Sequence, residues 1–177
     1  MTRLVSRDDA AALAALLTDN REFLAPTDPY RAESYYSVAG QDELIEDLLA
    51  KRAAGTLLPH VILDDRGLVV GRITLNEIVR GPFQSCSVGY WVAEDVTRRG
   101  LASAALASMA EIAFGELELH RIQAGTLTHN VASQKVLERN GFQRFGLAPA
   151  YLKIAGSWQD HILWQLLTPH DDSAVDV

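Results

Sequence analysis

Residues 88–103 constrain the fold of this chain more than any other segment. The apolar run Val88–Val92 is followed by a short loop with two arginines, and then by an alanine-rich run whose apolar residues recur at helical spacing. This order predicts a strand, a basic turn and a helix. The first amides of a helix lack intrahelical partners, and the helix dipole adds partial positive charge there. The pattern therefore favours a cradle for a pyrophosphate-bearing ligand, and the alternative is an ordinary strand-to-helix turn. The cradle residues would be Arg98, Arg99, Gly100, Leu101, Ala102 and Ser103.

This cradle differs from the common nucleotide-binding fingerprints. The sequence contains no G-x-x-x-x-G-K-[ST] motif, which argues against a P-loop NTPase. It also has no G-x-G-x-x-G motif opening a helix after the first strand, which argues against a dinucleotide-binding fold.

Composition narrows the class of protein further. The 177 residues suit one domain, which we expect to span residues 1–168, followed by a polar, disordered tail at 169–177. A formal charge of −7 disfavours nucleic acid as a partner and modestly favours cationic substrates such as amines. Cys86 is the single cysteine, and no histidines stand at metal-ligand spacing, so we expect neither a disulfide nor a metal site. The absence of a leader and of a membrane-length apolar run predicts a cytoplasmic protein with no membrane partner.

Hydrophobic periodicity predicts alternating helices and strands. The segment Asp64–Gly67 is typical of a hairpin turn between two of the strands. The expected architecture is a mixed α/β sheet with a cleft where two central strands part. The predicted helices cover residues 8–18, 41–54, 101–116 and 132–140, and the predicted strands cover 60–64, 68–78, 85–92, 121–127, 142–146 and 158–167.

Two motifs together resemble the GNAT superfamily of acetyl-CoA-dependent N-acetyltransferases. Its phosphate loop reads Q/R-x-x-G-x-G/A, which Gly100 and Ala102 fit and Thr97 does not. Its later helix reads N-x-x-S followed by G-F, and Asn130, Ser133 and the pair 141–142 fit that pattern. The segments 20–26 and 156–161 look like the RimJ/RimL-type branch, which acetylates N-terminal amines of ribosomal proteins. The resemblance implies an acyl-CoA N-acyltransferase fold, with a mostly antiparallel sheet splayed between strands 4 and 5 and flanked by helices.

The resemblance also implies how acetyl-CoA is held. Backbone groups of Tyr90, Trp91 and Val92 would bind the pantetheine arm like an added strand, and the basic turn would hold the diphosphate. The alternatives are a simple buried strand and a solvated pair of arginines. Asn130 would give the cofactor a hydrogen bond, although an asparagine there is also a good N-cap.

Acetyl transfer to an amine requires a proton donor for the departing thiolate and a proton acceptor for the amine. Some family members place a tyrosine donor on the later helix, but residues 131–140 contain none, so Ser133 is the hydroxyl candidate there. Alternation along the strand 68–78 would put Glu77 on one side with Ile73, Leu75 and Val79, where it is either a base or an edge residue. Asp160 and His161 are the other candidates for the base.

These observations predict an enzyme that transfers acetyl from acetyl-CoA directly to a primary amine, most simply a protein N-terminus. A small-molecule acceptor, such as an antibiotic or a polyamine, would use the same chemistry. A non-catalytic acyl-CoA sensor is the alternative from another class. The chain would act as a monomer or a homodimer.

Overall fold

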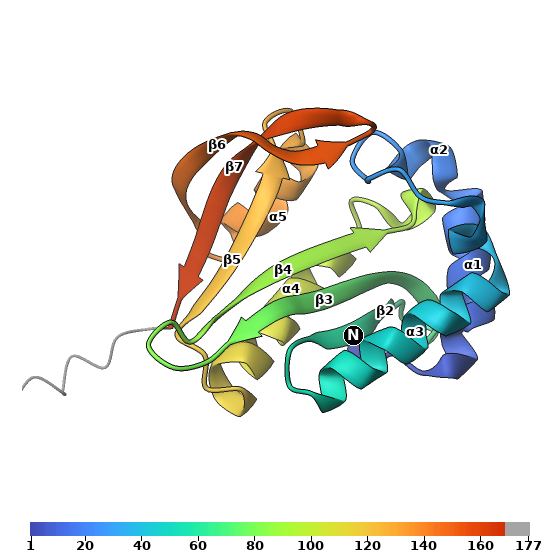
Figure 1. Cartoon of the computed structure of the whole chain (residues 1–177), viewed down its shortest axis with the longest axis horizontal. Helices are drawn as coiled ribbons and strands as arrows, with labels where there is room; N and C mark the ends of the chain where they lie inside the picture. The colour runs from blue at the N-terminus through green and yellow to red at the C-terminus, as the bar shows by residue number, and fades with distance from the viewer. Residues whose placement is uncertain (169–177) are drawn as a thin grey trace, which may run out of the picture.

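The computed structural model describes residues 1–168, whose strands form a single seven-stranded sheet in the order β1-β2-β3-β4-β5-β7-β6 (Figure 1). The neighbouring pair β4 and β5 is parallel, and every other pair is antiparallel. The predicted mixed and mostly antiparallel sheet is therefore confirmed.

One half of the sheet is built from β1 (Thr2–Leu4), β2 (Leu58–Leu63), β3 (Val69–Val79) and β4 (Ser85–Val92). The predicted turn between β2 and β3 forms because the side chain of Asp64 accepts hydrogen bonds from the backbone N–H groups of Arg66 and Leu68, both at 2.9 Å. The sequence did not predict strand β1, because three residues are too few to show the alternation of apolar and polar side chains that marks a strand.

The other half contains β5 (Arg121–Leu127), β6 (Gln143–Ile154) and β7 (Ser157–Leu167). The expectation that the strand would end at residue 146 was wrong, because β6 continues to Ile154 through an irregular register between Ala148 and Leu152. Pro149 lies in that irregularity, and Ala150 there has a φ of 47°. Proline is tolerated in strands at such bulges, whereas in the sequence it resembles the end of a strand.

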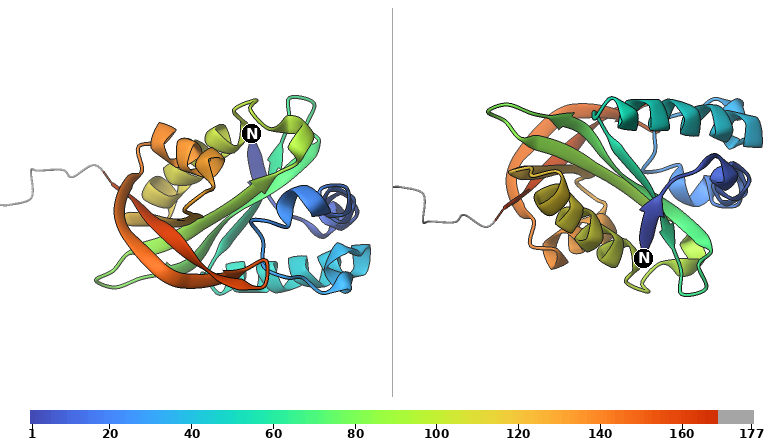
Figure 2. Two further views of the ribbon diagram at one scale, coloured as in Figure 1. Left: turned by 90° about the horizontal axis from the view of Figure 1, so that it is seen from above. Right: turned by 90° about the horizontal axis from the view of Figure 1, so that it is seen from below.

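Helices cover both faces of the sheet (Figure 2). On one face lie α1 (Ala10–Asp19), the short α2 (Arg21–Leu24) and α3 (Val38–Ala53), and on the other lie α4 (Leu101–Glu111) and α5 (Val131–Arg139). Single turns of 3₁₀-helix span Arg7–Asp9, Glu33–Tyr36 and Glu94–Val96, and a π-helical turn at Ile112–Glu116 extends α4.

Each face has its own apolar core. The larger core packs Ile73, Leu75 and Ile122 of the sheet against Leu106 and Met109 of α4. The smaller core joins residues of α1, α3 and β2 on the opposite face. Two buried layers of this kind hold the sheet rigid from both sides.

The loop 25–32, which follows α2, contacts the turn between β6 and β7. The backbone N–H of Ala155, in the turn between β6 and β7, donates to the carbonyl of Asp28 at 3.1 Å. In the same turn Gly156 has a φ of 80°, which favours glycine, and a Cβ there would lie 2.5 Å from the ring of Tyr30. The loop 25–32 thus reaches across to the far hairpin, as Figure 1 shows.

The expected tail at 169–177 lies outside the described residues, and the assignment of 1–168 as one domain stays a prediction. Within residues 1–168, no helix has the length and apolar character needed to span a membrane.

Candidate acyl-transfer site

Strands β4 and β5 part within the sheet. Their parallel ladder consists of the pairs Ser85–Arg121, Cys86–Ile122 and Ser87–Gln123. Beyond Ser87, β4 continues alongside β3 and β5 continues alongside β7, so the two strands splay apart (Figure 1). The edge of β4 from Val88 to Val92 therefore faces the gap with backbone groups that a ligand can pair with.

The basic turn forms a backbone concavity next to this edge. Arg98 and Gly100 both have positive φ, at 63° and 81°, and α4 begins directly after them. The N-cap is Gly100, which supplies no side chain to the first amides of α4, and a Cβ at this position would meet open space. The first turn of α4 therefore offers free amides and the positive end of the helix dipole, which fits a diphosphate.

The side chains around the turn take separate roles. The Thr97 hydroxyl donates to the carbonyl of Glu94 at 2.7 Å, so the residue that departs from the family motif closes the preceding 3₁₀ turn. Arg99 lies 3.7 Å from Asp65, and both side chains are at least half exposed, so this ion pair holds Arg99 weakly. Asn140, after α5, donates to Ser103 at 2.9 Å and ties the two helices together beside the cradle.

Helix α5 begins at Val131, one residue before the predicted start at 132. The side chain of Asn130 accepts a hydrogen bond from the backbone N–H of Ser133 at 3.1 Å, so Asn130 is the N-cap of this helix. This cap fixes the first turn of α5 and with it the position of the Ser133 hydroxyl.

The partner of Ser133 is a residue that the sequence indicated only for its backbone. The Tyr90 hydroxyl lies 2.9 Å from Ser133 Oγ and 3.3 Å from the Ser133 carbonyl oxygen. Burial raises the pKa of Tyr90 to about 12, against the opposing effect of the hydrogen bond with Ser133. The phenol therefore stays protonated near neutral pH and can donate. These residues are 43 positions apart, and no sequence signal pairs them.

Glu77 lies on the opposite side of the sheet from the one expected. Its φ of 51° belongs to an irregularity of the β3–β4 ladder between Asn76 and Val79. The bulge shifts the alternation, so that Ile78 packs against the larger core while Glu77 is exposed and its carboxylate accepts from the Ser87 hydroxyl at 3.4 Å. Glu77 thus lies beside the last paired residue of β4.

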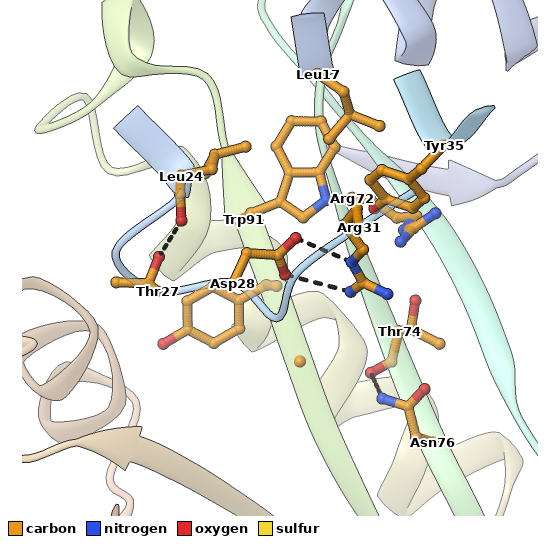
Figure 3. A pocket seen from close by; sticks show the side chains of 12 residues that line it. Leu17, Leu24, Thr27, Asp28, Arg31, Tyr35, Arg72, Thr74, Asn76 and Trp91 are labelled. Carbon is orange, nitrogen blue, oxygen red and sulfur yellow. Dashed lines mark hydrogen bonds and ion pairs between the residues drawn. The ribbon is translucent and has the colours of Figure 1, made fainter. Parts of the chain in front are cut away.

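Two cavities meet along this face of the sheet. One, of about 510 Å³, is lined by Glu77, Ser87, Asn76, Lys51, Thr56 and Leu57. The other, of about 310 Å³, also contains Asn76 in its wall and continues along β3 and β4 toward the loop 25–32 (Figure 3). Its remaining lining residues are Leu17, Leu24, Thr27, Asp28, Arg31, Tyr35, Arg72, Thr74, Gly89, Tyr90 and Trp91.

The other candidates for a base have structural partners. The carboxylate of Asp160 accepts from the backbone N–H of Ala150 at 2.8 Å, in the β6 irregularity. His161 is buried, with Nδ1 3.0 Å from the carbonyl of Gln159. Burial raises the pKa of the Cys86 thiol to about 12, which makes it a poor nucleophile. Among residues 1–168, no three His, Cys, Asp or Glu side chains gather as a metal site would require.

Comparisons with known proteins show the family and the fold of this chain. The profile of the acetyltransferase (GNAT) domain family matches residues 1–143. The [ribosomal protein uS5]-alanine N-acetyltransferase of Escherichia coli K12 is 33% identical over 170 residues, which cover 96% of this chain and 88% of the relative.

Solved structures are similar over almost the whole chain. The ribosomal-protein-S5-alanine acetyltransferase of Vibrio fischeri superposes with a TM-score of 0.90 at 30% identity, covering 97% of this chain and 93% of its own. Mycobacterium smegmatis RimJ in complex with CoA-disulfide also gives a TM-score of 0.90, at 33% identity, covering 94% of this chain and 80% of its own.

Proposed function

Since the chain belongs to the GNAT family of acetyltransferases, we propose that it transfers acetyl from acetyl-CoA to the primary amine of a protein N-terminus. The observation that carries this proposal is the parting of β4 and β5 beside an open helix N-terminus. The unpaired edge of β4 is followed along the chain by the anion cradle. This arrangement suits a long ligand with amides at one end and a diphosphate at the other.

The chain's own groups fit such a ligand. The backbone of Tyr90, Trp91 and Val92 would pair with the pantetheine amides, and residues 98–103 would hold the diphosphate. Asn130 would stand at the same end of the cleft, at the start of α5. When bound, acetyl-CoA supplies an acetyl group activated as a thioester.

Ser133 and Tyr90 would provide the proton for the departing sulfur. A serine hydroxyl alone is a weak acid, but the neutral phenol of Tyr90 at 2.9 Å can donate to Ser133 Oγ as that oxygen gives up its own proton. The hydroxyl pair would thus deliver one proton to the thiolate while the carbon–sulfur bond breaks.

Glu77 would accept the proton that the amine loses as the new carbon–nitrogen bond forms. Its exposed carboxylate lies beside Ser87, where β4 and β5 separate, and lines the 510 Å³ cavity. Because the carboxylate is exposed, a water molecule can pass the proton to it.

A protein N-terminus is favoured as the acceptor by the relatives. The E. coli and V. fischeri proteins are named as acetyltransferases that act on an alanine of ribosomal protein S5 (uS5). The cavity between loop 25–32 and the sheet is lined by Arg72, Thr74 and Asn76 in turn along β3, which suits an extended peptide.

The test measures release of free CoA thiol by the purified protein from acetyl-CoA, with peptides that begin with alanine or serine. Ser133→Ala and Glu77→Gln should each lower kcat by about 100-fold or more and leave coenzyme A binding intact. Glu43→Gln, at an exposed position of α3, is the matched control and should not change kcat.

Each result has a distinct reading. Turnover of antibiotic or polyamine amines but of no peptide would show that the acceptor is a small-molecule amine and not a protein N-terminus. Binding of coenzyme A with no turnover of any amine would favour the sensor. Variants of Ser133 and Glu77 with normal kcat would show that these two residues are not the proton donor and acceptor.

A further inference from the structure

The wall of the 310 Å³ cavity contains a guanidinium group with no partner. Arg72, on β3, is half-buried, and its side chain makes no hydrogen bond or ion pair with any of residues 1–168, while its Nη1 is shielded from solvent. The other arginine in the lining, Arg31, is paired with Asp28. A buried donor without an acceptor is costly, so a site that retains one calls for an explanation in binding.

A second unpartnered donor lies next to it. Trp91 is the register partner of Arg72 across the β3–β4 ladder, and its indole Nε1 is likewise buried without an acceptor among the described residues. Figure 3 labels Trp91 and Arg72 among the residues that line the cavity, with the Asp28–Arg31 pair drawn beside them. Guanidinium and indole groups can only donate, so both lack the same thing, an acceptor oxygen.

The charges of the cavity point to an anionic oxygen. Asp28 is the acidic residue in the lining, and Arg31 binds both of its carboxylate oxygens, at 3.1 and 3.2 Å. The positive charge of Arg72 is therefore left over in a chain whose formal charge is −7. A carboxylate can accept from the guanidinium and the indole at once, whereas a second cation would be repelled.

The nearby residues that would suit a cationic acceptor are already engaged. Glu33 accepts two hydrogen bonds from Arg21, both at 2.9 Å, and this pairing holds the pKa of the Glu33 carboxyl below its usual value. Arg21 also covers the ring of Tyr36, and Arg31 covers the ring of Tyr35. On the acceptor side, the groups that could bind a cation are thus already paired, and the unpaired group is the Arg72 guanidinium. This arrangement favours an anionic acceptor group over a polyamine.

The register sets the distance from the reacting end. The cavity runs along β3 from Asn76, which adjoins Glu77, to Arg72, and four strand residues span about 13 Å. An extended peptide advances about 3.3–3.6 Å per residue. With its amine near Glu77, such a peptide would have the α-carbons of its second and third residues about 3–7 Å along this path. The long side chains of Arg72 and of an acidic residue at either position would have to span the remaining distance.

We propose that Arg72 and the Trp91 indole bind a carboxylate of the acceptor, so that the preferred substrates are peptide N-termini with Asp or Glu at the second or third position. This inference rests on the proposed function, since it names the class of N-terminus that the same site accepts. Arg72 acts here in acceptor recognition and takes no part in the chemical step.

The experiment compares alanine-initiated peptides that differ only in Glu, Gln or Lys at position two or three. For the wild-type protein, kcat/KM for the Glu peptide should exceed that for the Gln peptide by about tenfold or more, with the Lys peptide lowest. Arg72→Gln should bring the Glu and Gln peptides within about twofold of each other, chiefly by lowering kcat/KM for the Glu peptide. Arg72→Lys should keep part of the preference, and Arg66→Gln, in the exposed β2–β3 turn, should keep all of it.

Equal use of the three peptides by the wild-type protein would overturn the inference and leave the proposed function standing, as would a preference that survives in Arg72→Gln. Absence of turnover with every peptide would instead contradict the proposed function. In that case calorimetric binding of the same peptides decides the inference: tighter binding of the Glu peptide, lost in Arg72→Gln, supports it, and equal binding refutes it.

Discussion

Substitution of Gly100 can separate the role of the cradle in ligand binding from its effect on the stability of the protein. Its φ is +81°, and a Cβ there would meet nothing within 4 Å, so substitution by alanine strains the backbone without a clash. Gly81, in the turn between β3 and β4, has a φ of +71° and the same open surroundings. The two turns stand at opposite ends of β4, because Gly81 precedes the strand and Gly100 follows it.

An alanine at either position should cost about 1–2 kcal/mol of unfolding free energy, because the left-handed conformation crowds a Cβ. In a chain of this size that loss lowers Tm by about 2–8 °C. Only Gly100→Ala also places a methyl group where a phosphate would approach the first amides of α4. Losing one charge-assisted hydrogen bond there would weaken coenzyme A binding by about 10- to 100-fold.

The assay is a pair of measurements on both variants: thermal unfolding without ligand, and titration calorimetry with coenzyme A. We expect similar losses of Tm and a change of Kd in Gly100→Ala alone. Unchanged affinity in Gly100→Ala, or an equal loss in Gly81→Ala, would refute the assignment of the turn as the diphosphate site.

Three further outcomes are expected. Tyr90→Phe should lower the unfolding free energy by about 1 kcal/mol and reduce kcat more than it changes KM for acetyl-CoA, and an unaltered kcat would show that Ser133 works without the phenol. Arg72→Met should raise the unfolding free energy in urea by about 1–3 kcal/mol because it removes an unpaired buried donor, and a decrease would reveal a stabilising contact. Burial lowers the pKa of His60 from its ordinary value of 6.5 to about 4, so the unfolded chain binds more protons between these values. Stability should therefore fall as the pH drops from 6.5 toward 4, and His60→Gln should flatten that slope in acid denaturation curves.

The sequence predicted the parts of the site that depend on local order along the chain. The strand at 85–92 ends where it was expected, and the turn with Gly100 leads into α4, because alternation and helical spacing are local signals. The N-cap at Asn130 is local in the same way.

The remaining features depend on contacts between distant segments. The bulge at Glu77 has no glycine to mark it, so alternation predicted the wrong face for this side chain. The hydrogen bond from Tyr90 to Ser133 and the unpartnered Arg72 emerge only once the sheet is assembled. A missing partner in particular cannot be seen in a sequence, since it is a property of everything packed around the group.

Because the ladder between β4 and β5 is short, the edge of β4 beyond Ser87 has no partner strand in the middle of the sheet. A molecule that fills this gap completes the hydrogen bonding of the fold, and the unfolded chain offers it no equivalent place. A ligand that binds only the folded protein therefore raises the free energy of unfolding. At a concentration of 100 times its Kd, it adds about 2.7 kcal/mol. A ligand that pairs with the free edge of β4 would extend the hydrogen bonding between the two halves of the sheet beyond the three residue pairs that β4 and β5 share.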